Sequence, residues 1–534
     1  MAGTADPISM ADIARIAGQS RSTVGNWKAR HADFPAPVSR TSRGPLYDRN
    51  DVEDWLHRTG RLIEVSHTNT TTEALTNTVP MFTPSTVLER VDTATGLVLL
   101  VLRWLDPAGQ WDRSLDTTGR WDRAVKLAEA GDVDGLRQLV HTALPLADGL
   151  VDWRAWDGRA SELAGVVNEI ASLDKTRIPK LVDAVAIRCA FDGSGEIEEV
   201  PRDFVVVPSA VRSLIAGLLD PLPCDQQERN ESRATGDSIY QTGSGLGQVI
   251  TDAARADDGS TGDLFVQESS ARKAQLARLN LAAHGLEAAV HSGDYLQEDV
   301  FPQLRADRVI ATPPWEPKIS GLRDTAEDPR WLWGEPGVND CYLAWIQHTL
   351  YHLADGGRAV VLLPLNALFA REKSARTLRR IVKAGHVEGV VSLPAGAIPG
   401  TSSRGVLLVL IKTPRPDDWF TTTTMVDMSI SPDGSPSPEG VPTPETALHI
   451  LEIYREYAAG GVVEAFNWAT VGLEQIAAND FILDPGRYQQ FTGPISDIEQ
   501  IMVNFSGMRL RLQSLLKACR VADQDIVTML EIEQ

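Results

Sequence analysis

Short apolar runs alternate with amphipathic stretches along the chain from about residue 238 to residue 412. The runs have the length of buried strands, and the stretches between them have the spacing of helices. Strands that alternate with helices pack as a parallel sheet covered on both faces. The pattern therefore predicts an α/β domain over residues 201–415 with a Rossmann-like, doubly wound sheet. The predicted strands are Leu264–Val266, Arg308–Ala311, Ala359–Leu363, Val387–Leu393 and Val406–Ile411.

Helical periodicity dominates two further regions. Residues 81–200 contain "RWDRAVKLAEAGDVDGLRQLVHTAL" and "ASELAGVVNEIASL" with few strand-like runs, which predicts a helical domain. Residues 446–534 form a C-terminal region in which we expect a long amphipathic helix, with Ile495, Ile498 and Ile501 at helical spacing. This apolar stripe fits packing against its own chain as well as pairing with a partner helix.

Two stretches have the composition of linkers. Residues 62–80 are rich in Thr and Asn and have too few apolar side chains to offset the entropy of ordering, so they are predicted to be a flexible tether. Residues 416–445 are rich in Pro, Ser, Thr and Asp and are predicted to be a second linker.

The first 61 residues have the pattern of a small winged helix-turn-helix module. Ile13 and Ile16 recur at helical spacing, Val24 and Trp27 give a second helix its apolar side, and a basic hairpin-like segment and a third helix follow. This arrangement presents polar and cationic side chains to a DNA major groove, and the alternative is a protein-packing module. It resembles the modules of the excisionase and MerR-like group. The candidate DNA-binding residues are Arg21, Ser22, Thr23, Asn26, Lys28 and Arg43.

Charge and cysteine content narrow the function classes. The net charge of −21 argues against a surface coated throughout for nucleic acid, although a local basic patch is still allowed. The four cysteines lack CxxC spacing, which favours a reducing cytoplasm over a zinc site or a disulfide scaffold. No run approaches the ~18 apolar residues of a membrane span, so we expect no membrane partner.

Candidate chemistry follows three successive predicted strands. "SIYQTGSGLGQVI" places Gly243, Gly245 and Gly247 between a strand and a helix, where glycines let the backbone approach a ligand. Glu268 follows the next strand, where a carboxylate can accept hydrogen bonds from two ribose hydroxyls or can cap a helix N-terminus. Asp294 follows a third strand and is placed to reach an adenine amino group, or it is a solvated turn aspartate.

A fourth strand end is rigid. Thr312, Pro313, Pro314 and Trp315 follow an apolar run, and the prolines cannot continue a strand because they have no N–H to donate. The four residues are predicted to form a turn at the exit of a buried strand, where an α/β protein keeps its active site.

These motifs together resemble the modification subunit of type I restriction systems, within the N6-adenine DNA methyltransferases. The likeness covers about Phe204 to Lys412, and the N-terminal module is not part of that family's usual pattern. The matching stretches are "QESSARKAQLARLNLAAHG", "SGDYL", "PPW", "NDCYLAWIQHTLYHLADGGRAVVLLPLNALF" and "EGVVSLPAGAIPGTSSRGVLLVLIK", with "FILDPGRY" near the C-terminus.

The resemblance implies a cofactor, partners and roles. The cofactor is S-adenosylmethionine, with Gly243 and Gly245 at its methionine part, Glu268 at the ribose and Asp294 at the adenine ring. The target adenine leaves the duplex, Trp315 stacks on it, and a polar side chain and a carbonyl of the Pro-Pro turn accept hydrogen bonds from its amine. Neither a metal nor a covalent nucleophile is required, and the expected partners are DNA and a specificity subunit.

The sequence departs from the family's pattern at two places. The Pro-Pro turn usually begins with Asn or Asp, and Thr312 stands there instead. The glycine motif usually opens with an acidic residue and a proline, and here Gln241 and Thr242 take those positions; Gln241 is a candidate cofactor-binding residue. These departures leave two functions open, an adenine-N6 DNA methyltransferase and a catalytically degenerate DNA-binding or regulatory protein. Methylation of RNA or protein is a third that shares the fold.

Overall fold

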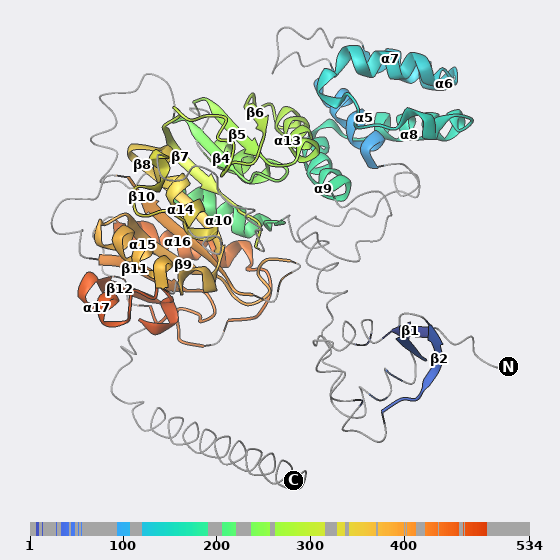
Figure 1. Cartoon of the computed structure of the whole chain (residues 1–534). Helices are drawn as coiled ribbons and strands as arrows, with labels where there is room; N and C mark the ends of the chain where they lie inside the picture. Colours follow the sequence, from blue (N-terminus) through green and yellow to red (C-terminus); the bar gives the residue numbers. More distant parts are fainter. Residues whose placement is uncertain are drawn as a thin grey trace. The chain divides into compact units, whose positions relative to one another are not determined.

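A computed structural model gives the arrangement of the chain (Figure 1). It describes residues 93–106, 120–190, 205–220, 237–256, 262–315, 328–336, 341–369, 372–399, 401, 403–412, 422–435, 437–458, 463 and 465–488, and in the N-terminal part residues 7–9, 13, 28, 34–41, 44–48, 52 and 55. The chain divides into two compact units, Met1–Thr83 with Ser194–Val200 and Pro84–Gly193 with Pro201–Gln534. The predicted linker 62–80 and the amphipathic helix expected from residue 495 onward lie outside the described residues.

The N-terminal unit contains a small antiparallel sheet. Its strands are β1 (Pro7–Ser9), β2 (Pro37–Thr41) and β3 (Gly44–Asp48), in the order β1-β3-β2. The pairing of β2 with β3 confirms the hairpin-like segment predicted from the sequence. Phe34 packs edge-on against Tyr47 and Trp55 at ring-centroid distances of 5.7 and 5.0 Å. Tyr47 and Trp55 are buried together with Ile13 and Val52, and the partly buried Phe34 packs against this core.

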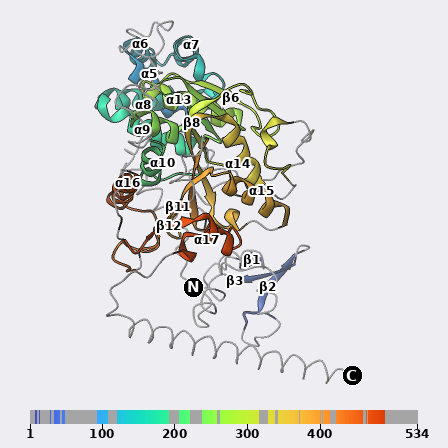
Figure 2. The same ribbon diagram turned by 90° about the vertical axis from the view of Figure 1, so that its left-hand side faces the viewer.

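The larger unit is built on a nine-stranded sheet in the order β12-β11-β9-β10-β8-β7-β4-β5-β6. Figure 2 shows the layers of this unit from the side. The strands are β4 (Ile239–Thr242), β5 (Leu264–Glu268), β6 (Ala289–Ser292), β7 (Ala306–Ala311), β8 (Leu353–Pro364), β9 (Val387–Ser392), β10 (Gly405–Ile411), β11 (Thr422–Asp427) and β12 (Trp468–Gly472). All five strands predicted from the apolar runs are present, and the largest difference is at β8, which begins six residues before the expected Ala359.

The sheet is mixed, so the prediction of a parallel sheet is wrong in part. β4, β5, β6, β7 and β8 pair in parallel, but β10 lies antiparallel between β8 and β9. A parallel strand requires a crossover connection that usually contains a helix. The described residues between β9 and β10 contain no helix, and the chain turns directly back into β10.

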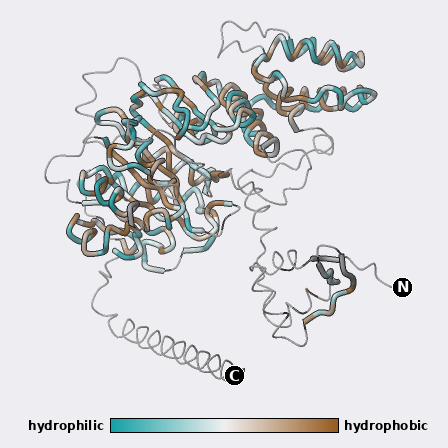
Figure 3. Tube along the Cα trace, in the orientation of Figure 1, coloured by the Kyte–Doolittle hydropathy of each residue, from teal (hydrophilic) through white to brown (hydrophobic). Residues whose placement is uncertain are grey.

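Successive residues of the central strands point to opposite faces, each covered by helices. Val360 and Leu362 of β8 belong to one buried cluster, whereas Val361 and Leu363 belong to the other. Strands that are apolar on both faces have to be covered on both, and Figure 3 shows apolar residues concentrated in the sheet. The first face carries α10 (Ser209–Leu219), α12 (Gln248–Arg255), α13 (Ala271–Ala283) and α16 (Pro444–Ala458), and the second carries α14 (Cys341–His352) and α15 (Glu372–Lys383).

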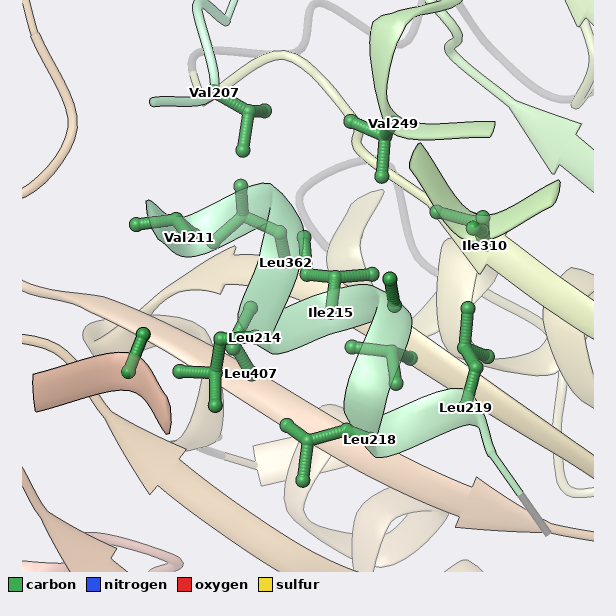
Figure 4. Packing of buried hydrophobic residues seen from close by; sticks show 14 of the residues in the cluster. Val207, Val211, Leu214, Ile215, Leu218, Leu219, Val249, Ile310, Leu362 and Leu407 are labelled. Carbon is green, nitrogen blue, oxygen red and sulfur yellow. The ribbon is translucent and has the colours of Figure 1, made fainter. Parts of the chain in front are cut away.

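Helix α10 fills the first face. Val211, Leu214, Ile215 and Leu218 of this helix pack with strand residues such as Leu407 (Figure 4). Each of these side chains is almost completely buried. Burial of a Val, Leu or Ile side chain contributes roughly 1.5–3 kcal/mol, which makes α10 a main anchor of this layer.

The described residues of the segment 81–200 are mainly helical, and a separate helical domain with these bounds stays a prediction. The helices are α5 (Thr93–Leu105), α6 (Arg120–Glu129), α7 (Val133–Ala143), α8 (Ala160–Ser172) and α9 (Ile178–Ala190). The side-chain amide of Gln275 on α13 donates to the carbonyl oxygens of Leu146 and Asp148 at 2.9 and 2.6 Å, which ties this helical part to the sheet. The helices among the described residues include none that is long and apolar enough to cross a membrane.

The linker predicted at residues 416–445 is wrong for β11. Thr422–Asp427 pairs in parallel with β9 and antiparallel with β12, so it extends the sheet. β-Branched Thr side chains favour a strand, although the flanking Pro and Ser residues hide it in the sequence. The remaining elements are α17 (Leu473–Ala478) and the 3-10 turns η1 (Pro145–Ala147), η2 (Trp153–Trp156), η3 (Lys175–Arg177), η5 (Pro329–Trp331), η6 (Leu365–Leu368) and η7 (Pro485–Arg487).

Candidate active site

Four predicted site segments meet at one edge of the sheet. β4, β5, β6 and β7 run in parallel, so their carboxyl ends share that edge. The glycine loop (residues 243–247) follows β4, Glu268 ends β5, Asp294 follows β6 and Thr312 follows β7. Because β4 pairs with both β5 and β7, the glycine loop lies between Glu268 and Thr312.

The glycine loop has a backbone conformation that side chains resist. The φ angle is +63° at Gly243, +55° at Gly245 and +71° at Gly247, all in the left-handed region. Gly243 also lacks room for a side chain, because a Cβ atom would lie 2.9 Å from the carbonyl oxygen of Thr312 and 3.3 Å from the ring of Trp345. The close approach that glycine permits here is therefore to the end of β7.

Glu268 is buried and holds the glycine loop from the other side. Its Oε2 accepts a 2.7 Å hydrogen bond from the N–H of Gly245, and its Oε1 accepts from the N–H of Ser270 at 3.2 Å and the hydroxyl of Ser269 at 3.1 Å. Burial raises the pKa of the Glu268 carboxyl, although these donors and the nearby Lys273 oppose the shift. The bond to Ser270, the N-cap of α13, agrees with the helix-capping alternative, and the bond to Gly245 links the same carboxylate to the loop.

Gln241 and Thr312, two of the three positions that depart from the family's pattern, are hydrogen-bonded to each other. Gln241 Nε2 donates to Thr312 Oγ1 at 3.3 Å, and the Thr312 hydroxyl donates to the carbonyl oxygen of Gly243 at 2.6 Å. Gln241 Oε1 accepts from the N–H of Ile250 on α12 at 3.0 Å. Gln241 is fully buried with both ends of its amide bonded inside the protein, so a direct cofactor contact by this residue stays a prediction that the geometry does not favour.

The Pro-Pro corner is held from two sides at Trp315. The hydroxyl of Tyr342 on α14 donates to the carbonyl oxygen of Trp315. The Trp315 ring lies against Gly405 at the start of β10, where a Cβ atom would come within 3.3 Å of it. Trp315 is only partly buried, so a ring face for base stacking is compatible with this position, and the stacking itself stays a prediction.

Asp294 forms the turn that follows β6. Its side chain is exposed, and Oδ1 accepts from the N–H groups of Leu296 and Gln297 at 3.0 and 3.2 Å. These bonds are those of an aspartate that stabilises its own turn. The second carboxylate oxygen can still accept an amino group, so both alternatives from the sequence are compatible with the geometry.

Two buried hydroxyls beside the glycines were not found from the sequence. Thr242 Oγ1 and Ser244 Oγ are buried, and neither has a hydrogen-bond partner within the part of the chain that the structure describes. A buried hydroxyl without a partner costs free energy unless a bound molecule completes it. The two groups flank Gly243, and only their position among the glycines could have pointed to them.

A group with metal-ligating side chains lies on the second face of the sheet. Ligand atoms of Asp299, His348 and His352 lie within 4.8 Å of one another. His352 Nε2 lies 3.1 Å from Asp299 Oδ2, and His352 Nδ1 lies 3.1 Å from the carbonyl oxygen of Leu304. Both ring nitrogens of His352 therefore have acceptors inside the protein.

The tautomer of His348 argues against a metal at this group. Burial lowers the pKa of His348 well below its ordinary value, so the ring is neutral. Arg330 Nη1 lies 3.2 Å from His348 Nδ1, which must accept, so the proton sits on Nε2, 3.4 Å from the hydroxyl of Tyr240. A nitrogen that carries its proton cannot ligate a metal. Hydrogen bonding thus explains the group without an ion.

The predicted DNA-binding residues fall mostly outside the described part of the chain. Lys28 is described and is exposed, with its Nζ 5.7 Å from the ring centroid of Tyr47. The residues outside the description are Arg21, Ser22, Thr23, Asn26 and Arg43. The helix-turn-helix assignment therefore stays a prediction.

Comparison with known families and proteins gives a consistent result. The profile of the N-6 DNA Methylase family matches residues 205–494, more than half of the 534-residue chain. The Type I restriction enzyme HindI methylase subunit of Haemophilus influenzae is 23% identical over 289 residues, which are 53% of this chain and 62% of that relative. The MjaIX methylase subunit of Methanocaldococcus jannaschii is 25% identical over 236 residues, 42% of either chain. The chain thus spans 62% and 42% of the lengths of these relatives.

Solved structures share the fold. A crystal structure of the type I restriction-modification methyltransferase subunit of Streptococcus thermophilus matches with a TM-score of 0.57 and 22% identity, covering 69% of this chain and 80% of that one. A structure from work on the assembly and conformational transition of a type I restriction-modification system matches with a TM-score of 0.53 and 17% identity, covering 86% and 99%.

Proposed function

The chain belongs to the N-6 DNA Methylase family, and from this premise we propose that it transfers a methyl group from S-adenosylmethionine to N6 of adenine in DNA. We propose further that it is the modification subunit of a type I restriction-modification system, the class named in its relatives. The observation that carries the proposal is the bonding of Glu268 and Thr312 to one glycine loop, through contacts of 2.7 and 2.6 Å.

The residues at this edge fit the cofactor. Gly243 and Gly245 offer backbone without side chains, and the buried hydroxyls of Thr242 and Ser244 have no partner among the described residues. The three protein donors use three of the roughly four lone pairs of the Glu268 carboxylate, which leaves one on Oε2 for a ligand hydroxyl. In our proposal the glycine loop holds the methionine part, Glu268 the ribose hydroxyls and Asp294 the adenine ring.

The cofactor supplies an electrophilic methyl group that no side chain provides. The chain's own residues then have to orient the acceptor amine and exclude water. A stacked adenine cannot reach the strand ends, so it has to swing out of the duplex. The Pro313–Pro314 corner offers a stiff backbone, a carbonyl oxygen of the corner accepts a hydrogen bond from the amine, and Trp315 offers a ring for stacking.

Thr312 acts through the glycine loop in this proposal. Its hydroxyl donates to Gly243 and accepts from Gln241, so it joins the cofactor loop to the Pro-Pro corner. The acceptors for the amine are then backbone carbonyls of the corner, which do not depend on an Asn or Asp side chain. The replacement of Asn or Asp by Thr312 therefore leaves acceptors for the amine in place.

DNA and a specificity subunit are the proposed partners. Relatives in this class carry the name of methylase subunits of restriction enzymes. The N-terminal unit is proposed to add its own DNA contact, with Lys28 as one exposed cation. DNA affinity of such contacts falls as salt is added, because bound counterions are released.

Transfer of labelled methyl tests the proposal. The chain, alone and with a specificity subunit, is incubated with labelled S-adenosylmethionine and adenine-unmethylated genomic DNA, and the nucleosides are identified after digestion. N6-methyl-2′-deoxyadenosine is expected, and a Glu268→Ala variant is expected to lose most of it. Calorimetric titration with S-adenosylmethionine runs in parallel.

The titration separates the outcomes. Binding of S-adenosylmethionine without transfer to DNA in any combination leaves a catalytically degenerate DNA-binding or regulatory protein. Absence of binding to the wild-type chain and its complex would remove the cofactor proposal. If the label appears only in RNA or protein, DNA is the wrong substrate and the labelled molecule is the substrate instead.

A further inference from the structure

The buried side chain of Arg330 is hydrogen-bonded to the turn that carries Asp294. Arg330, in η5, is 8% exposed. Its Nη1 donates to the carbonyl oxygen of Tyr295 at 2.9 Å, and its Nη2 donates to that of Leu296 at 2.8 Å. Asp328 neutralises the guanidinium through Nε and Nη2, with contacts of 3.0 and 2.6 Å. The charge is therefore buried together with its partner and with strong acceptors.

Arg330 and Asp294 bond to different backbone groups of the same turn, Arg330 to carbonyl oxygens and Asp294 to N–H groups. Asp294 Oδ1 accepts the N–H groups of Leu296 and Gln297, while Arg330 takes the carbonyl oxygens of Tyr295 and Leu296. Tyr295 itself packs on Trp345 of α14 with ring centroids 4.1 Å apart. The backbone on either side of the Asp294 carboxylate thus has few ways to move.

A chain of hydrogen bonds connects Arg330 to the two ends of the turn. Arg330 approaches Nδ1 of His348, whose Nε2–H faces the hydroxyl of Tyr240, and that hydroxyl lies 3.3 Å from Gln267 Oε1. Gln267 Nε2 donates to the carbonyl oxygens of Gly293 and Glu298 at 3.2 and 2.7 Å. Buried polar groups that are all bonded in this way rigidify what they enclose.

We propose that Arg330 is a positioning residue for the cofactor site, which holds the Gly293–Glu298 turn so that Asp294 meets the adenine ring of S-adenosylmethionine. The inference rests on the proposed function for the identity of the ligand. It assigns to Arg330 no contact with the ligand. Its effect on binding has to pass through Asp294.

A double-mutant cycle tests that route. The affinity for S-adenosylmethionine is measured by calorimetry for the wild-type chain, Arg330→Met, Asp294→Ala and the double variant. We expect each single variant to weaken binding roughly tenfold or more, as loss of a hydrogen bond to a charged group does. The double variant is expected to bind about as weakly as Asp294→Ala alone, because residues that act through one another are not additive. Additive losses would overturn the proposal.

The conservative variant and a matched control separate positioning from general stability. Arg330→Lys keeps the charge and part of the bonding, and it is expected to recover part of the affinity. Arg308→Met removes an equally buried arginine at the amino end of β7, paired with Asp237 at 3.2 Å. We expect this control to lower the unfolding temperature and to leave the affinity for S-adenosylmethionine unchanged. An equal loss of affinity in the control would show that Arg330 has only a structural role.

Hydrogen–deuterium exchange tests the anchoring without any ligand. In Arg330→Met, amides of the Gly293–Glu298 turn are expected to exchange faster, while those of α10 keep their protection. If the wild-type chain fails to bind S-adenosylmethionine, the proposed function fails and the exchange result still tests the anchor. If binding is normal and the turn exchanges no faster in the variant, the proposal for Arg330 is wrong.

Discussion

The hydroxyl of Thr312 donates a 2.6 Å hydrogen bond to the carbonyl oxygen of Gly243, which joins the end of β7 to the loop that follows β4. The same hydroxyl accepts from Gln241. Two of the three residues at which this chain departs from the family's pattern, Gln241 and Thr312, are therefore hydrogen-bonded to each other. A change at one position alone would leave a buried amide or hydroxyl without its partner.

Thr312→Val keeps the shape of the side chain and removes the hydroxyl. We expect a loss of about 1–3 kcal/mol in the free energy of unfolding, because the carbonyl oxygen of Gly243 and the amide of Gln241 both lose a buried partner. Urea denaturation measures it. Thr312→Ser, which keeps the hydroxyl, is expected to stay within about 1 kcal/mol of the wild type. Equal losses in the two variants would contradict a role for this bond.

Gly243→Ala introduces a methyl group where the chain has no space. A Cβ atom at Gly243 would lie 2.9 Å from the carbonyl oxygen of Thr312, whereas one at Gly285 would meet nothing within 4 Å, and the φ angles are similar at +63° and +74°. Gly285→Ala is therefore the control for backbone strain alone, expected to cost about 1 kcal/mol. Gly243→Ala is expected to cost about 3 kcal/mol and to abolish the binding of S-adenosylmethionine. Thermal unfolding and calorimetry compare the two.

Glu268 gives the stability a defined pH dependence. Burial raises the pKa of its carboxyl above the ordinary value of 4.5, so the folded chain holds this proton more tightly than the unfolded chain. The stability of the wild type relative to Glu268→Gln is expected to be greatest below pH 4.5 and to fall as the pH rises through the raised pKa. Denaturation of both proteins from acidic to neutral pH measures the difference.

Glu445, an exposed glutamate, is expected to give the opposite pH dependence of stability. Bonds from the backbone N–H of Glu445 and from Thr443 lower the pKa of the Glu445 carboxyl, in the first turn of α16. The wild type relative to Glu445→Gln should therefore lose stability as the pH falls. The same trend in both pairs would show that the titration is not local to Glu268.

Arg404 compensates a buried carboxylate at the end of β11. Asp427, at the end of β11, is 3% exposed and accepts from Arg404 Nη2, from the hydroxyl of Ser392 at 3.0 Å and from Ser429. Arg404→Met leaves that carboxylate without its counter-charge, and we expect a loss of about 3 kcal/mol in unfolding free energy. The control is Arg455→Met, in which an exposed arginine loses its ion pair with Asp220. This variant is expected to lose less than about 1 kcal/mol in unfolding free energy. Comparable losses would argue against the burial effect.

Local patterns predicted the parts of the site that depend on neighbours in sequence. The glycines after β4 and the carboxylate after β5 follow apolar runs that have to be buried, so their position at strand ends could be derived from the alternation. The contacts of Thr312 with Gly243 and of Glu268 with Gly245 follow from the strand order, which brings the ends of β5, β4 and β7 together.

The remaining features depend on partners distant in the sequence. Arg330 bonds to carbonyl oxygens 35 and 34 residues earlier, and a lone arginine between a proline and a tryptophan carries no signal of that contact. The reversed direction of β10 depends on how the chain turns after β9, which apolar periodicity does not record. Strand β11 was hidden because Thr-rich segments between prolines have the composition of loops.

The parallel pairing of β11 with β9 determines where the chain can be cut. A fragment that stops at residue 415 would bare the hydrogen-bonding edge of β9 and the apolar side of α10, against which Leu451 of α16 lies. A naked edge strand recruits other chains and aggregates. A fragment that carries the sheet should therefore extend at least through β12, because β11 and β12 protect the edge of β9 from self-association.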